Sequence, residues 1–357
     1  MIALGFWKKG ARDFMGLKLN LFAPALALVL AVGPTNLLAQ SAASSEPAKK
    51  QSVQKSSAKP KVAQKKPKAS AKKKVVKKSN TRSFASAAAS QSLGSRLGLR
   101  DEFTEVALNS SAVIVVDQSS GEVLLEKNPD VPLPIASVTK VMTAIVTLEA
   151  GLPLDEVITI AREDASLQKY NGSRLHVGAR FTRDQLLHLA LMSSDNRAAH
   201  ALGRMYPGGL AEFVAAMNRK AQALGMAHSK FVEPTGLSSE NQSTPRDLSR
   251  LVNAAHAFPL IREYSTAPSA IVRVGKKTQE FRNTNALARA GEWDLGLSKT
   301  GFIRDAGRCL VMQATIDDQD VIIVMLDAQA SAKRLRDAER IRQWLETERK
   351  IQDLARS

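Results

Sequence analysis

The sequence predicts an α/β (α+β) protein in which an antiparallel sheet is flanked by helices and a helical subdomain is inserted between its strands. Two observations lead to this fold class. Runs of β-branched and other apolar residues lie near residues 112–126 and again near 295–327, whereas helical patterns fill most of the interval between them. Strands at both ends of a domain favour a single antiparallel sheet that is built from the first and the last strands of the chain. The junction of sheet and helices is then the natural place for a site.

Each strand is marked by an apolar run next to turn residues. A Gly-containing turn at 118–121 separates the first two runs and predicts a hairpin. A short polar turn at 317–320 separates the last two runs in the same way. The expected strands are 112–117, 122–126, 295–300, 308–316 and 321–327.

The helices are predicted from their caps and their apolar spacing. Thr182 and Gln185 form a capping-box pattern, and Thr244 with Pro245 places a cap before a proline at the first helical position. The expected helices are 137–150, 186–192, 210–224, 245–258 and 332–351. The apolar stripe of the last helix comprises Leu335, Ile341, Trp344 and Leu345.

The first forty residues resemble an export signal. Four basic residues precede the apolar run 21–32, and Ala39 is a suitable small residue before a cleavage site. The apolar run has 12 residues and contains Pro24, whereas a membrane-spanning helix needs about 20. We therefore expect residues 1–39 to be a cleaved signal peptide, with a membrane anchor as the alternative.

A Lys-rich linker is predicted over residues 40–100. Residues 41–100 contain 13 Lys and three Arg against the single acid Glu46, a net charge of +15. Such a segment cannot bury enough apolar surface to fold, so we expect it to be disordered. It suits anionic envelope polymers or lipid headgroups, although a tether without any partner fits the composition equally well.

The remaining residues, 101–357, form the predicted folded domain and carry a net charge of only −1, out of +17 for the whole chain. A nucleic-acid enzyme would carry its positive charge on the folded domain, so no nucleic-acid partner is expected. The five histidines show no metal-ligand spacing, and no metal or other cofactor is expected. The single cysteine, Cys309, lies in an apolar run and is expected to be a buried thiol.

The string Ser137-Val-Thr-Lys140 is the strongest candidate for nucleophilic chemistry. Of the five Ser-x-x-Lys strings in the chain, three lie in the Lys-rich linker and one, starting at Ser166, precedes a Gly-containing loop. Ser137 instead opens a helix that must be buried, and Lys140 follows it on the same helical face. We predict Ser137 as a nucleophile and Lys140, with its pKa lowered by burial and by a neighbouring cation, as its base. The alternative is that Ser137 only caps the helix.

A second polar string, Ser194-Asp-Asn196, follows the helix 186–192. Ser194 can relay a proton to a leaving nitrogen, and the Asn196 amide can hold a substrate backbone. The same residue types are also ordinary helix caps. The competing string Ser239-Glu-Asn241 lies among turn residues and is interpreted as structural.

A third string, Lys299-Thr-Gly301, is expected to follow a short strand. Lys299, which should stay charged, and the Thr300 hydroxyl can together hold a carboxylate. Gly301 allows a substrate chain to lie close to the strand. The backbone amides of Phe302 and Ser137 can form an oxyanion hole.

These three strings, together with Phe231-Val-Glu-Pro-Thr-Gly-Leu237 and Ser243-Thr-Pro-Arg-Asp-Leu248, resemble the low-molecular-mass penicillin-binding proteins, the serine D-alanyl-D-alanine peptidases. The resemblance implies the transpeptidase-like (β-lactamase-like) fold, a periplasmic location, peptidoglycan peptides as substrates and β-lactams as inhibitors. By position it makes Ser137 the acyl-ester nucleophile and Lys140 its proton acceptor. Ser194 and Asn196 become the second catalytic element, and Lys299 with Thr300 the carboxylate site.

Two features of the sequence narrow this resemblance. Only 56 residues follow Gly301, too few for the added C-terminal β domain that is typical of the D-alanine carboxypeptidases. The runs Pro134-Ile-Ala-Ser-Val-Thr-Lys140 and Ser193-Ser-Asp-Asn196 look more like the D-alanyl-D-alanine endopeptidases, which cut existing cross-links. We therefore predict a serine DD-endopeptidase that cleaves D-alanyl-diaminopimelate cross-links.

Three other functions stay open at this point. The first is a D-alanyl-D-alanine carboxypeptidase, because both substrates place a carboxylate next to the scissile amide. A β-lactamase is the second, although the chain has no Glu-x-x-Leu-Asn string between Asn196 and Lys299. The third is a non-catalytic cell-wall-binding scaffold that uses the Lys-rich linker.

Overall fold

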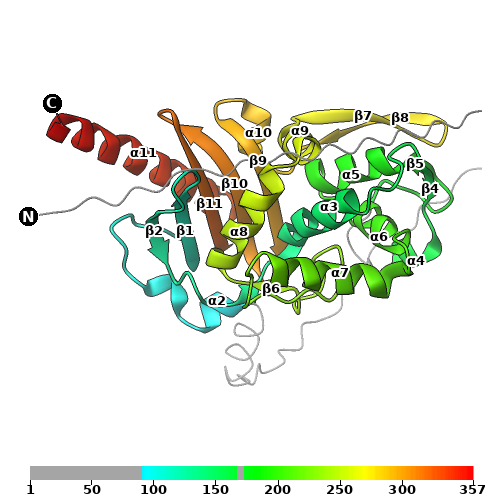
Figure 1. The fold of residues 1–357 in the computed structure, drawn as a ribbon, viewed down its shortest axis with the longest axis horizontal. Coiled ribbons are helices and arrows are strands. Elements are labelled where there is room, and N and C mark those ends of the chain that lie inside the picture. The colour runs from blue at the N-terminus through cyan, green and yellow to red at the C-terminus, as the bar shows by residue number, and fades with distance from the viewer. Residues whose placement is uncertain (1–90, 167–172, 357) are drawn as a thin grey trace, which may run out of the picture. The chain divides into compact units, whose positions relative to one another are not determined.

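A five-stranded antiparallel sheet lies at the centre of the computed structural model, which describes residues 91–166 and 173–356 (Figure 1). Helices lie against both faces of this sheet. The predicted signal peptide and most of the Lys-rich linker lie outside the described residues. None of the helices within the described ranges is both long and apolar enough to span a lipid bilayer.

The sheet joins the two ends of the described chain, as predicted. Its strand order is β2-β1-β11-β10-β9, and β1 pairs with β11 in the register Ala112 opposite Leu326. The turn between β10 and β11 holds Asp317 and Asp318 at positive φ, which suits a tight hairpin of two acidic turn residues. The strands are β1 (Ala112–Asp117), β2 (Val123–Lys127), β9 (Asp294–Ile303), β10 (Gly307–Ile316) and β11 (Gln319–Ala328).

One face of the sheet is covered by α11 (Ser331–Arg356), which packs Ala338, Ile341 and Leu345 against it. The predicted stripe of this helix is only partly right, because Leu335 is half-buried whereas Arg334 is buried. Polar contacts explain the difference. The Arg334 guanidinium donates to the Cys309 carbonyl oxygen, so the buried face of the helix is not purely apolar.

The other face of the sheet packs against the helical subdomain. At its centre is α3, whose first nine residues are all buried. The Thr182 capping box and the Thr244 cap are both present, as predicted. The main helices are α3 (Thr139–Glu149), α5 (Arg183–Met192), α6 (Asn196–Arg204), α7 (Gly209–Ala223), α8 (Pro245–His256) and α9 (Pro259–Thr266).

Several short elements complete the fold, and most of them have no counterpart among the predicted helices and strands because each is too short to show a clear periodic pattern. The largest is the hairpin of β7 (Ser269–Val274) and β8 (Lys277–Arg282), which turns at Gly275 with φ +62°. The short helices are α2 (Leu93–Arg96), η1 (Leu99–Asp101), η2 (Ala136–Val138), α4 (Arg162–Ser166) and α10 (Ala286–Ala290). The short strands are β3 (Leu133–Pro134), β4 (Val157–Thr159), β5 (Arg180–Thr182) and β6 (Gln242–Ser243).

The Lys-rich linker was predicted to run to residue 100, but residues 91–100 belong to the folded part. Leu93 and Leu99 pack against the main core, and the Arg100 guanidinium donates to the Asp327 carbonyl oxygen at 2.9 Å. Arg100 therefore contributes its positive charge to a contact inside the folded domain. The predicted boundary between linker and domain, at residue 100, lies too late in the sequence.

Candidate active site

The nucleophile predicted from the sequence lies in η2, immediately before α3. Lys140 Nζ is 3.0 Å from Ser137 Oγ, 2.5 Å from Asn196 Oδ1 and 2.6 Å from the Thr235 carbonyl oxygen. A neutral amine has two N–H donors and one lone pair. The two carbonyl-type oxygens can take the donors, which leaves the lone pair for the Ser137 hydroxyl. This arrangement suits proton abstraction from Ser137.

Burial is the main cause of the altered pKa of Lys140. The side chain is completely buried, and this lowers its pKa from 10.5 to about 8, while the carboxylates of Glu233 and Asp195 act in the opposite direction. The lowering of this pKa by burial agrees with the prediction. The predicted neighbouring cation is not among its causes, and the opposing acids were not predicted. Lys140 is therefore poised to exchange a proton near neutral pH.

Two glycines hold the backbone that carries the nucleophile. Ala136 has φ +48°, an uncommon conformation for a residue with a side chain. A Cβ atom on Gly236 would lie 1.9 Å from the Ala136 carbonyl oxygen, and one on Gly301 would lie 2.8 Å from the Ile135 carbonyl oxygen. Gly301 was predicted to make room for a substrate chain, yet its tightest contact is with this backbone. The strained turn is thus enclosed on both sides.

The loop that carries Gly236 is fixed by Glu233. Its carboxylate accepts hydrogen bonds from the amides of Thr235 and Gly236, each at 2.6 Å. Asn241 donates both to this carboxylate, at 3.0 Å, and to Thr139 Oγ1, at 3.1 Å. The structural interpretation of Ser239-Glu-Asn241 agrees with these contacts, whereas the part played by Glu233 was not predicted.

The second and third strings meet across the site. Lys299 Nζ donates to Ser194 Oγ and to the Thr300 carbonyl oxygen, each at 2.9 Å. Ser194 has φ +59°, a strained conformation of the kind that often occurs at functional sites. The Thr300 hydroxyl donates to Thr284 Oγ1 at 2.6 Å. The string Lys299-Thr-Gly301 lies within the ten-residue strand β9, not after a short strand as predicted.

Lys299 was expected to keep its charge, and its surroundings oppose that charge. Burial is the largest cause, and the charges of Lys140 and Arg334 add to it, so that the pKa of Lys299 is lowered well below 10.5. An anion bound nearby would restore the favourable countercharge.

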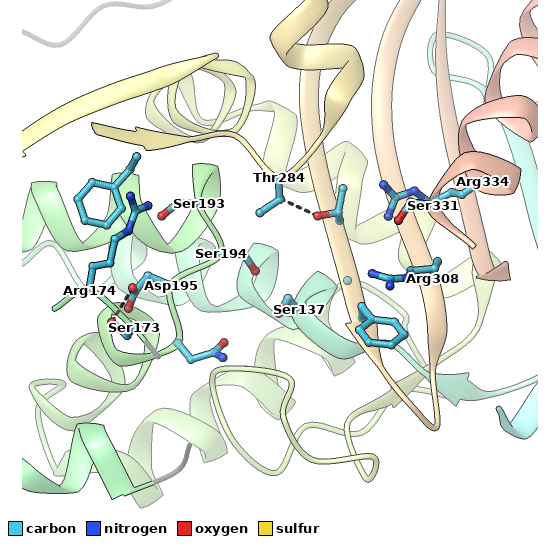
Figure 2. Close-up of a pocket in the computed structure, with 15 residues that line it drawn as sticks. Ser137, Ser173, Arg174, Ser193, Ser194, Asp195, Thr284, Arg308, Ser331 and Arg334 are labelled. Atoms are coloured by element: carbon cyan, nitrogen blue, oxygen red, sulfur yellow. Dashed lines mark hydrogen bonds between the residues drawn. The ribbon is translucent and has the colours of Figure 1, made fainter. Parts of the chain in front are cut away.

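A cavity of about 530 Å³ opens above these groups (Figure 2). Lys140 and Lys299 are buried outside its lining. The other six predicted residues line it: Ser137, Ser194, Asn196, Thr300, Gly301 and Phe302. The lining also includes three arginines that were not singled out from the sequence, Arg174, Arg308 and Arg334. Arg334 is buried, and its Nε has no hydrogen-bond partner among the described residues. No local sequence pattern distinguishes these arginines from surface arginines.

Cys309 takes no part in this arrangement. Its thiol is fully buried, and burial raises its pKa to about 12. The prediction of a buried core thiol is therefore confirmed.

Comparison with known proteins agrees with the family resemblance inferred from the sequence. Residues 100–330 match the family described as D-alanyl-D-alanine carboxypeptidase. The chain is 50% identical over 242 residues to the D-alanyl-D-alanine endopeptidase of Pseudomonas aeruginosa, covering 67% of this chain and 78% of that protein. It is 43% identical over 240 residues to the D-alanyl-D-alanine endopeptidase of Escherichia coli, covering 67% and 77%.

Solved structures agree with the predicted fold class. The crystal structure of the Streptomyces K15 DD-transpeptidase superposes with a TM-score of 0.63 and 27% identity, covering 68% of this chain and 98% of that one. The D-alanyl-D-alanine carboxypeptidase of Mycobacterium tuberculosis H37Rv has a TM-score of 0.63 and 27% identity, covering 70% and 95%. The transpeptidase-like fold and the serine peptidase class are thereby confirmed. The match over residues 100–330 and the identity to the Pseudomonas protein show that this chain belongs to the D-alanyl-D-alanine carboxypeptidase family.

Proposed function

We propose that the protein is a serine DD-endopeptidase that cleaves D-alanyl-diaminopimelate cross-links of peptidoglycan through an acyl-enzyme on Ser137. The contact of Lys140 Nζ with Ser137 Oγ, 3.0 Å, is the observation that carries the proposal. The names of the Pseudomonas and Escherichia relatives support the endopeptidase reaction over the carboxypeptidase reaction.

In the acylation step, neutral Lys140 takes the hydroxyl proton as Ser137 Oγ attacks the D-alanyl carbonyl carbon. The carbonyl oxygen becomes an oxyanion, for which the backbone amides of Ser137 and Phe302 are the proposed donors. When the amide bond breaks, the leaving nitrogen takes a proton, with Ser194 as the proposed relay. Water then attacks the ester and regenerates Ser137.

The carboxylate beside the scissile amide fixes the orientation of the substrate. Its proposed binding groups are the Thr300 hydroxyl and the Arg334 guanidinium, which both line the cavity. Lys299, buried beneath the lining, is proposed to add positive charge. Asn196 accepts a hydrogen bond from Lys140 through Oδ1, and its side-chain NH2 group is proposed to hold the substrate backbone. A β-lactam carries a similar carboxylate and is the proposed inhibitor.

Labelling with fluorescent penicillin tests the nucleophile. We expect the full chain to be labelled and Ser137→Ala to be unlabelled. Ser239→Ala, outside the cavity lining, is the matched control and should be labelled like the original protein. Failure of the original protein to react would instead favour a non-catalytic scaffold.

Digestion of purified muropeptides tests the reaction. We expect cross-linked dimers to be cut to monomers. Survival of the dimers together with loss of D-alanine from pentapeptides would identify a carboxypeptidase. Rapid turnover of a chromogenic β-lactam would identify a β-lactamase.

We also propose that residues 1–39 are removed after Ala39 and that the mature protein works in the periplasm. The proposal rests on the basic start and the apolar run of the first forty residues. The Lys-rich linker is proposed to bind anionic envelope surfaces through its net positive charge. Mass analysis of the N-terminus of the exported protein would test the cleavage.

A further inference from the structure

The cavity carries more positive charge than the predicted chemistry uses. Three arginines line it, and Asp195 is the only acidic residue in its lining among the described residues. Figure 2 shows Arg308 and Arg334 on the sheet side of Ser137, whereas Arg174 lies on the opposite side. The single substrate carboxylate next to the scissile amide accounts for the positive charge on the sheet side only, and leaves Arg174 without a role.

Arg174 is held in place without being neutralised. Its guanidinium carbon lies 3.8 Å from the centroid of the Phe281 ring, and Nη1 donates to the Glu280 carbonyl oxygen at 2.5 Å. None of the ion pairs formed within residues 91–166 and 173–356 involves this guanidinium. A guanidinium stacked on a ring keeps its planar edge available for two parallel hydrogen bonds to a carboxylate.

The backbone around Arg174 is also fixed. Ser173 Oγ donates to Asp195 Oδ2 at 2.7 Å, next to Ser194 in the sequence. The Arg197 guanidinium donates to the Leu175 carbonyl oxygen at 2.7 Å. These contacts tie the segment that carries Arg174 to the start of α6, and hence to the polar string of the site.

The orientation of the substrate decides which of its parts meets Arg174. In the proposed function, the leaving group and its carboxylate lie toward Thr300 and Arg334. The acyl part must then extend to the opposite side of Ser137, where Arg174 and Phe281 line the cavity. Because the guanidinium there has no carboxylate partner among the described residues, its natural ligand is a negative group on the acyl side of the substrate.

We propose that Arg174, seated on Phe281, forms an acyl-side anion subsite that binds a carboxylate of the stem peptide preceding the scissile D-alanyl bond. This inference rests on the proposed function, since it assumes that the cleaved peptide is acylated onto Ser137. It assigns the substrate class as stems with a free acyl-side carboxylate, in contrast to stems in which that group is amidated. Two carboxylates are available in such a stem, that of diaminopimelate and that of glutamate, and the experiment distinguishes them.

The test compares Arg174→Gln with the original protein on cross-linked muropeptide dimers. We expect KM to rise about tenfold with little change in kcat, because a charge-assisted contact made equally in the ground state and the transition state is lost. Arg174→Lys should recover only part of the affinity, since lysine cannot form the two parallel hydrogen bonds. Arg273→Gln, at an exposed position of strand β7 outside the cavity, is the matched control and should behave like the original protein.

Amidated substrates locate the bound group. A donor stem amidated at the diaminopimelate carboxylate, or alternatively at the glutamate carboxylate, should raise KM for the original protein about as much as Arg174→Gln does. The same amidation should have no further effect on Arg174→Gln. An equal loss for Arg174→Gln on free and amidated dimers would overturn the inference.

Penicillin separates the two proposals. Benzylpenicillin has an uncharged acyl-side group, so its rate of acylation should be unchanged by Arg174→Gln. A slower acylation would show that Arg174 acts on the nucleophile and not on the stem. Failure of the original protein to cut any dimer would overturn the proposed endopeptidase function instead, whatever the result for Arg174.

Discussion

Lys299 and Ser194, 105 residues apart in the sequence, are joined by a 2.9 Å hydrogen bond from the ammonium to the hydroxyl group. Two residues after Ser194, Asn196 accepts a hydrogen bond from the other buried lysine, Lys140, at 2.5 Å. The short string Ser194-Asp-Asn196 thus contacts both lysines. One loop therefore links the proposed nucleophile and its base to the proposed anion-binding groups of β9.

Lys140→Arg should abolish acylation. Arginine keeps a positive charge but does not give up its proton at any usable pH, so it cannot accept the proton of Ser137. We expect the acylation rate to fall about a thousandfold or more. The measurement is the rate of penicillin labelling, with far-UV circular dichroism as a control for folding. Substantial labelling of the variant would remove Lys140 as the base.

The acylation rate should rise with pH as Lys140 loses its proton, and this rise is the acid limb of the pH profile. Asp195→Asn should shift the acid limb to lower pH. The carboxylate of Asp195 raises the pKa of Lys140, so its removal should favour the neutral amine. Asparagine can still cap α6, where the Asp195 carboxylate accepts from the Ala198 amide at 3.1 Å. Labelling rates across the pH range give the limb directly, with the exposed Asp155→Asn as the control. If the acid limb lay at the same pH in the variant and in the original protein, the deprotonation of Lys140 would not be its cause.

The buried lysine should also make stability depend on pH. The pKa of Lys140 is about 8 in the folded protein and 10.5 in the free side chain, so between these values the unfolded state binds more protons and stability rises with pH. The difference corresponds to about 3 kcal/mol. Lys140→Met lacks this contribution. We expect the variant's stability relative to the original protein to fall as the pH rises from 8 to 10.5.

Urea unfolding at a series of pH values would measure this difference. The loss of hydrogen bonds to Asn196 and Thr235 in Lys140→Met costs free energy, but that cost does not vary with pH. The contribution of the Lys140 pKa is therefore given only by how the difference in the free energy of unfolding changes with pH. A constant difference between the two proteins across the range would contradict the lowered pKa.

Gly236→Ala should both destabilise the protein and slow acylation. Its φ is +80°, and the added Cβ would lie 1.9 Å from the Ala136 carbonyl oxygen, so the turn before Ser137 must move. We expect a loss of more than about 2 kcal/mol in the free energy of unfolding. Gly275→Ala is the matched control, because Gly275 has φ +62° with nothing within 4 Å. It should cost only about 1 kcal/mol and leave the labelling rate unchanged.

The proximity of the proposed catalytic groups could be predicted from the sequence because these groups lie in short strings on regular elements. Ser137 and Lys140 are brought together by a helical offset of three residues, which can be read directly from the chain. The five-stranded sheet could be predicted for a similar reason, since its strands are continuous apolar runs bounded by turns.

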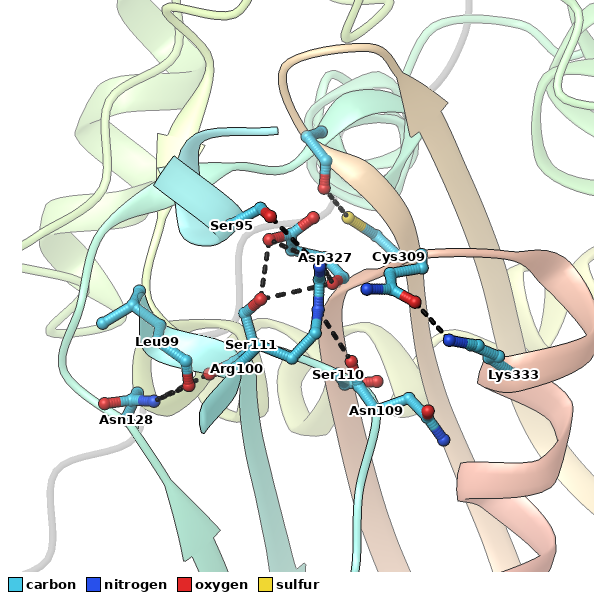
Figure 3. A network of polar contacts seen from close by, with 12 residues as sticks. Ser95, Leu99, Arg100, Asn109, Ser110, Ser111, Asn128, Cys309, Asp327 and Lys333 are labelled. Carbon is cyan, nitrogen blue, oxygen red and sulfur yellow. Dashed lines mark hydrogen bonds and ion pairs between the residues drawn. The ribbon is translucent and has the colours of Figure 1, made fainter. Parts of the chain in front are cut away.

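Groups held by tertiary contacts could not be predicted in this way. Figure 3 shows Arg100 and Ser111 converging on Asp327, and Ser111 Oγ donates to Asp327 Oδ2 at 2.7 Å across 216 residues of sequence. No local pattern indicates that partnership, so the domain boundary was placed after Arg100. Glu233 and Arg334 were missed for the same reason, because each acts on a residue from a distant element.

Deleting residues 41–90 should separate catalysis from surface binding. This segment carries a net charge of +13, and the deletion spares residues 91–100, which pack against the core. We expect hydrolysis of small soluble muropeptides to be unchanged. Binding to intact sacculi or anionic vesicles should weaken, because the deleted charge is attracted to anionic polymers and headgroups.

Salt distinguishes electrostatic attraction from simple tethering. The Debye length is about 8 Å at 0.15 M ionic strength, so exposed charges are increasingly screened above that concentration. The difference in sacculus binding between the full chain and the deletion variant should therefore shrink as salt is raised. A variant in which the lysines of 49–78 are replaced by glutamine keeps the length of the segment and should bind as weakly as the deletion. Equal binding of all three proteins at low salt would reduce the segment to a passive spacer.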